Sequence, residues 1–145
     1  MNIFRTFALG ITMVGLMMPH ATQAEENTAT ARFFYSETCP TCHVMRAYMD
    51  QVCALNPDVP IEMLDTSVNP EAWQSACEGA GIPVWGGPRM FIQDRVFADW
   101  SDEEGELVYI PSYYGYMGYR NQVIDALEAA FGELKLPDEE KSDEP

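Results

Sequence analysis

Two cysteines separated by two residues are the strongest chemical signal in the sequence. They belong to the motif Cys39-Pro40-Thr41-Cys42. A thiolate attacks disulfides, and a cysteine at the start of a helix has a lowered pKa because free backbone N–H groups and the helix dipole stabilise its charge. Pro40 suits the first helical position, which puts Cys39 at the N-cap. We therefore expect Cys39 to be the attacking sulfur and Cys42, one turn later and more buried, to be the resolving thiol.

The same residues allow three other interpretations of the pair. Because His43 follows Cys42, the motif also fits the pattern of covalent haem c attachment. A zinc site would need a second close pair, whereas Cys53 and Cys77 are far apart and no histidine stands at ligand spacing, so no metal is expected. A purely structural disulfide between Cys39 and Cys42 would close too small a loop to constrain the unfolded chain much. The redox pair is the favoured interpretation, and it requires no cofactor.

His43 has two interpretations of its own. On a helix that begins at Pro40 it lies opposite the apolar side, so by default it is a solvated surface residue. It also stands four residues after Cys39, where a protonated ring would lower the pKa of the thiol.

The elements that must position the pair are indicated by hydrophobic spacing and by turn residues. A β-favouring run ends just before Cys39, and Met45, Met49 and Val52 then repeat at helical spacing. The predicted order is β-α-β-α-β-β-α, with strands at 30–36, 59–65, 89–92 and 96–98 and helices at 40–56, 69–79 and 123–131. The stretch 100–119 gives no clear structural prediction. It is acidic at first, and the tyrosines that follow either cover the hairpin at 89–98, the favoured interpretation, or contact a protein partner. These tyrosines are Tyr109, Tyr113, Tyr114, Tyr116 and Tyr119.

The ends of the chain and its charge bear on location. Residues 1–24 are predicted to be a secretory signal, because Arg5 precedes an apolar run shorter than the about 20 residues of a membrane span and small residues lead up to Ala24. We expect a periplasmic protein with one domain at 25–134, which includes the insertion at about 100–119, and an acidic disordered tail at 135–145. The net charge of −15 opposes binding to nucleic acid and to anionic membranes.

With this element order, the chain resembles the thioredoxin-like superfamily from about residue 30 to residue 131. The resemblance rests on Cys39-Pro40-Thr41-Cys42 and on Gly87-Pro88 just before the strand at 89–92. Glutaredoxins and periplasmic disulfide oxidoreductases are the most similar members. Asp99 and its neighbours stand where glutaredoxins carry a Gly-Gly pair that helps to hold glutathione, so glutathione use is not implied.

The resemblance implies an α/β thioredoxin-like fold, a central mixed sheet flanked by helices. It implies that Pro88 follows a cis peptide bond and that Gly87 and Pro88 present backbone groups to a bound client. It also implies disulfide exchange with protein clients, in either direction, and a redox partner in the membrane. The alternative to this oxidoreductase is a redox-inactive binding module of the same fold.

Cys53 and Cys77 fall near the ends of the first two predicted helices. A structural disulfide between them is the favoured prediction, and it would contribute on the order of 3 kcal/mol in the chain-entropy model. The alternatives are two buried thiols that act as small hydrophobes, or a second redox pair that exchanges with Cys42.

Overall fold

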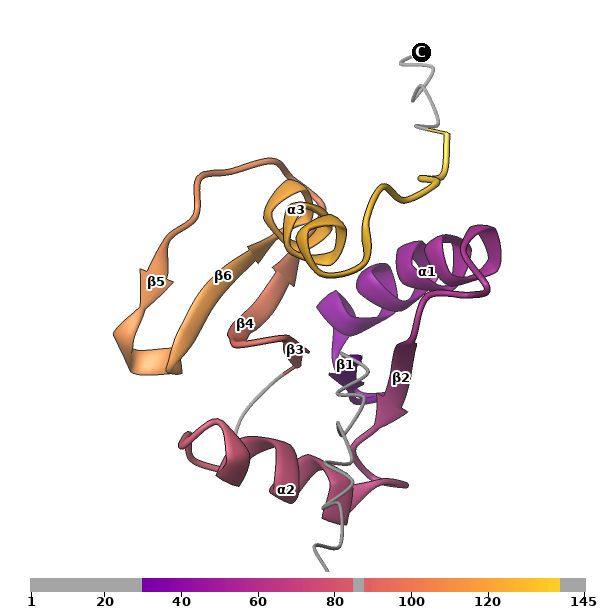
Figure 1. Cartoon of the computed structure of the whole chain (residues 1–145). Coiled ribbons are helices and arrows are strands. Elements are labelled where there is room, and N and C mark those ends of the chain that lie inside the picture. The colour runs from indigo at the N-terminus through magenta and orange to yellow at the C-terminus, as the bar shows by residue number, and fades with distance from the viewer. Residues whose placement is uncertain (1–29, 85–87, 139–145) are drawn as a thin grey trace, which may run out of the picture.

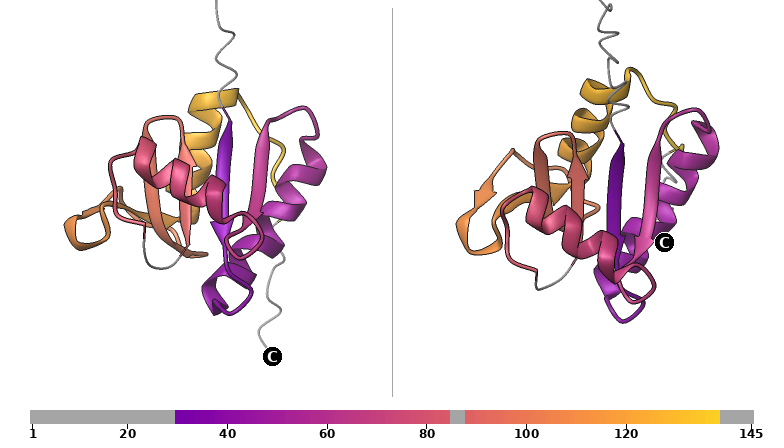
Figure 2. Two further views of the ribbon diagram at one scale, coloured as in Figure 1. Left: turned by 90° about the horizontal axis from the view of Figure 1, so that it is seen from below. Right: turned by 60° about the horizontal axis from the view of Figure 1, so that its bottom comes forward.

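The computed structural model describes residues 30–84 and 88–138. Within these residues, six strands form one mixed sheet in the order β2-β1-β3-β4-β6-β5. Helices α1 and α3 cover one face of the sheet and α2 covers the other (Figures 1 and 2). The elements are β1 (Ala31–Tyr35), α1 (Pro40–Leu55), β2 (Ile61–Asp65), α2 (Pro70–Gly79), β3 (Arg89–Ile92), β4 (Arg95–Ser101), β5 (Tyr109–Ile110), the 3-10 turn η1 (Pro111–Tyr113), β6 (Gly115–Tyr119) and α3 (Arg120–Phe131). The predicted signal at 1–24 lies outside the described residues.

The predicted elements are all present, and the sheet contains two more. Strand β1 pairs in parallel with β2 and antiparallel with β3, and β3 forms a hairpin with β4. The tyrosine-rich stretch adds β5 and β6, and β6 pairs in parallel with β4. The tyrosines therefore extend the sheet beyond the hairpin, and Tyr109, Tyr113 and Tyr114 remain exposed.

Alternation along β1 assigns its side chains to the two faces, as expected for a buried strand. Phe33 and Tyr35 point to the side of α1 and α3, where they belong to the main apolar cluster. Phe34 points to the other side, where its ring lies 5.2 Å from that of Trp73 in α2. Side chains of β1 therefore pack against the helices on both faces of the sheet.

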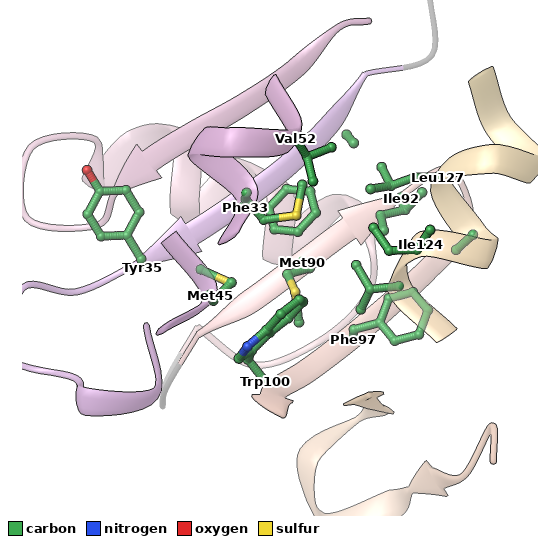
Figure 3. Close-up of a cluster of buried hydrophobic side chains, with 14 of the residues drawn as sticks. Phe33, Tyr35, Met45, Val52, Met90, Ile92, Phe97, Trp100, Ile124 and Leu127 are labelled. Atoms are coloured by element: carbon green, nitrogen blue, oxygen red, sulfur yellow. The ribbon is translucent and has the colours of Figure 1, made fainter. Parts of the chain in front are cut away.

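The main core lies between the sheet and the helices α1 and α3 (Figure 3). Helix α1 contributes the predicted apolar side, and Met45, Met49 and Val52 are fully buried. Strand residues and α3 complete the cluster, with Phe97 from β4 and Leu127 from α3 also buried. This packing fixes the direction of α1 and therefore the place of its first turn, which holds Cys39 and Cys42.

Strand β6 approaches β4 closely because two of its residues have no side chain. A Cβ on Gly115 would lie 2.8 Å from the carbonyl oxygen of Val96, and a Cβ on Gly118 would overlap the carbonyl oxygen of Asp99. Glycine is therefore required at both positions for the β4–β6 pairing.

Lys135, just beyond the domain end expected at residue 134, contacts the end of α1. Lys135 donates its backbone N–H to Asn56 Oδ1 at 2.9 Å, and its carbonyl oxygen accepts from Asn56 Nδ2 at 2.8 Å. These two bonds connect Lys135 to the end of α1, and the disordered tail expected at 135–145 stays a prediction. Across the described residues, no helix is long and apolar enough to cross a membrane.

Candidate active site

The cysteine pair lies at the start of α1, as predicted. Cys39 is the N-cap residue and Pro40 occupies the first turn. The two sulfurs form a disulfide, with Cα atoms 5.2 Å apart. Cys39 is partly exposed, whereas Cys42 is only 1% exposed and belongs to the core. An attacking nucleophile or a client sulfur can therefore reach Cys39 and not Cys42.

Two polar groups contact the sulfur of Cys39. The backbone N–H of Cys42 donates to Sγ at 3.2 Å, which is the N-cap hydrogen bond of the helix. The hydroxyl oxygen of Thr41 lies 3.3 Å from the same sulfur. A thiolate at this place gains the field of the helix N-terminus and one backbone hydrogen bond, so the arrangement suits a reactive thiol.

Asp99 links this turn of α1 to the sheet. Its Oδ1 accepts a hydrogen bond from the Thr41 hydroxyl at 3.2 Å and one from the backbone N–H of Trp100 at 2.8 Å. Its own N–H donates to the carbonyl oxygen of Pro88 at 3.1 Å. The chain of contacts from Cys39 through Thr41 and Asp99 places buried Pro88 at the same end of the sheet as the cysteine pair.

The structure adds one detail to the expectation for Pro88. The carbonyl oxygen of Pro88 accepts a hydrogen bond from the Asp99 N–H, which leaves one lone pair of this oxygen for a client. Gly87 lies outside the described residues. The prediction of a cis bond between Gly87 and Pro88 also stays a prediction.

His43 is exposed, and its ring is directed toward the loop that precedes the helix. The Nε2 atom lies 2.9 Å from the carbonyl oxygen of Glu37. The carboxylate of Glu37 forms an ion pair of 2.6 Å with Arg46, one turn of helix further on. The influence of His43 on the Cys39 thiol stays a prediction.

The predicted disulfide between Cys53 and Cys77 is wrong. Both residues are free thiols, Cys77 buried and Cys53 half-buried. Cys53 lies on α1 and Cys77 on α2, and the sheet separates these helices (Figure 2). Burial raises the pKa of both thiols above the ordinary value. The structure therefore matches the alternative of two unbonded thiols, and Cys77 on the far face is not placed to exchange with Cys42.

Thr41 and Asp99 were not predicted as site residues. The helical motif placed the Thr41 backbone near Cys39, but its hydroxyl contact was not anticipated. Asp99 lies far from Thr41 in the sequence. The one signal for it was that its segment stands where glutaredoxins carry a Gly-Gly pair. Within the described parts of the chain, no three histidine, cysteine, aspartate or glutamate side chains come together as a metal site.

The fold and the site together define a class of structure. An open mixed sheet flanked by helices, with a close cysteine pair at the start of α1, is compatible with a thioredoxin-like fold and with redox activity. No protein-family model, no curated protein and no solved structure matches the chain.

Proposed function

We propose that the protein is an exported, periplasmic thiol–disulfide oxidoreductase of the thioredoxin-like superfamily. The observation that supports it most directly is the asymmetric pair, in which accessible Cys39 caps α1 and is bonded to buried Cys42. The Cys39 sulfur can react with a client, and the buried Cys42 sulfur can then resolve the mixed disulfide, as two-step exchange requires. The proposed partners are protein clients and a redox protein of the membrane.

The exchange needs no cofactor. A client thiolate attacks the sulfur of Cys39, the Cys39–Cys42 bond breaks, and Cys42 leaves as a thiolate. A second client thiolate then attacks the client sulfur of this mixed disulfide and releases Cys39 as a thiolate. The client gains one disulfide and the protein pair gains two electrons. The reverse sequence reduces a client disulfide, and the reduction potential of the pair decides which direction dominates.

The backbone at Gly87 and Pro88 is the proposed contact for an extended client segment beside Cys39. Proline lacks an N–H, so neighbouring backbone groups would pair with the client in the manner of strand addition. Pro88→Thr is therefore expected to hold mixed disulfides longer.

The test compares wild-type protein with three cysteine variants in the reduction of insulin and in the oxidation of a reduced client. Cys39→Ser should abolish both activities, and Cys42→Ser should accumulate mixed disulfides because the resolving thiol is missing. Cys53→Ser is the matched control and should retain activity, since Cys53 lies outside the site. Unchanged turnover in Cys39→Ser would refute the proposal, and client binding without exchange would favour the redox-inactive binding module.

A further inference from the structure

The backbone of β4 is irregular at the point where it passes the cysteine pair. Ala98 pairs with Met117 and Ser101 with Tyr119, so β4 advances 101 − 98 = 3 residues while β6 advances 119 − 117 = 2. The extra residue forms a β-bulge. Bulges re-aim side chains and are frequent beside active sites.

Asp99 stands in this bulge with a φ of 73°, in the left-handed region that favours glycine. A residue with a side chain is held there only where its surroundings compensate for the strain. Gly118 opposite the bulge leaves room for the Asp99 carbonyl group. Hydrogen bonds at Pro88, Trp100 and Thr41 then fix both the backbone and the carboxylate of Asp99.

The direction of the Thr41 hydrogen bond has a chemical consequence. The single hydroxyl hydrogen of Thr41 points to the carboxylate of Asp99, which is a stronger acceptor than a disulfide sulfur or a thiol. Toward Cys39, the Thr41 oxygen can then only accept, which suits a protonated thiol and offers nothing to a thiolate. The negative charge of Asp99 also disfavours the Cys39 thiolate.

Other charged or titratable groups near the start of α1 are Glu37, His43 and Arg46. Glu37 and Arg46 form an ion pair, and the His43 ring contacts the Glu37 carbonyl. None of these contacts involves the Thr41 hydroxyl. Asp99 is therefore the carboxylate whose bonding bears directly on the group beside the Cys39 sulfur.

We propose that Asp99 is a positioning residue that lowers the reduction potential of the cysteine pair by holding the hydroxyl hydrogen of Thr41 away from Cys39. The carboxylate disfavours the Cys39 thiolate and with it the reduced pair, so the protein is a weaker oxidant than its helix N-terminus alone would make it. The effect on exchange with clients rests on the proposed function, whereas the effect on the Cys39 thiol can be measured without it.

The experiment measures two properties of the full chain and its variants. The first is the pH midpoint of Cys39 alkylation in the reduced protein, located by mass mapping, and the second is the reduction potential in a glutathione series. Asp99→Gly removes the acceptor and suits the positive φ at this position. It should raise the thiolate-to-thiol ratio about tenfold, the worth of one hydrogen bond to a charged group, and so lower the midpoint by about one pH unit. The potential should rise by up to about 30 mV, which corresponds to a factor of ten in this two-electron couple.

Three further variants make the result specific. Asp99→Asn removes the charge but keeps an amide oxygen that can accept from the Thr41 hydroxyl, so it should show smaller shifts than Asp99→Gly. Asp94→Asn removes the same charge from the far end of the β3–β4 hairpin and should leave both properties unchanged. In a Thr41→Val background, Asp99→Gly should have a clearly smaller effect, because the hydroxyl that transmits it is missing.

The outcomes separate the two proposals. If the midpoint and the potential of Asp99→Gly equal those of Asp94→Asn, the role of Asp99 is refuted. An Asp99→Gly effect of equal size in the Thr41→Val background would refute the route through Thr41. If the wild-type protein alkylates as expected yet exchanges with no client, the proposed function fails while the role of Asp99 stands.

Discussion

Gly118→Ala gives a sharp test of the close pairing between β4 and β6. The added Cβ would overlap the carbonyl oxygen of Asp99 and lie 2.6 Å from Cε of Met90. The flexible end of Met90 can move away, but the Asp99 carbonyl belongs to a bulge whose N–H and side chain are both bonded. The backbone must therefore shift, and overpacking of this kind costs about 1–3 kcal/mol.

The upper part of that range applies, because the obstructing atom is backbone. Replacing a glycine also reduces the entropy of the unfolded chain, which offsets about 0.4–1 kcal/mol of this loss of stability. We expect the free energy of unfolding to fall by about 2 kcal/mol, measured by urea denaturation at an unchanged m-value. Gly79→Ala is the control, since a Cβ there meets no atom within 4 Å and helix propensity favours alanine by up to about 1 kcal/mol. A Gly118→Ala protein as stable as wild type would show that β6 does not approach Asp99 as described.

Three other predictions concern the rest of the chain. Asn56→Ala should lower the free energy of unfolding by about 1–2 kcal/mol and make the backbone near Lys135 more sensitive to limited proteolysis, because Asn56 holds that residue by two hydrogen bonds. The free energy of unfolding should fall as the pH rises past the ordinary thiol pKa, because the unfolded chain then loses the Cys77 proton before the folded chain does. In denaturation measured at several pH values, Cys77→Ala should make this fall with pH less steep. Protein made in a host with an active haem c pathway should show no Soret band, because buried Cys42 is inaccessible for thioether formation, and a covalent haem signal would contradict the disulfide at Cys39.

The sequence was a good guide where local chemistry determines the structure. Helix α1 begins at Pro40 and ends before Asn56, as its cap and turn residues indicated, and its predicted apolar side is buried. Cys39 and Cys42 could be found for the same reason, since a motif at a strand-to-helix junction is a local signal. These features need no knowledge of distant residues.

Features that depend on contacts between distant segments could not be predicted from the sequence. Strand β6 was missed because Gly115 and Gly118 weaken its β propensity, although the pairing with β4 requires them. The Cys53–Cys77 prediction failed because helix ends along the chain say little about which face of the sheet each helix covers. The contact between Thr41 and Asp99 spans 58 positions and depends on a bulge, which leaves no periodic signal.

The uneven covering of the sheet has a consequence for local unfolding. Among the residues that the structure describes, α2 is the one helix on its face of the sheet, and it carries one fully buried side chain, Cys77, whereas α1 and α3 each bury four. Segments with little buried apolar surface open at a lower free energy than the rest of a domain. Amide hydrogens of α2 should therefore exchange with solvent by a subglobal opening that leaves α1 and α3 closed. The Cys77 thiol would become reactive in that opened state while the Cys39–Cys42 end of the molecule keeps its native structure.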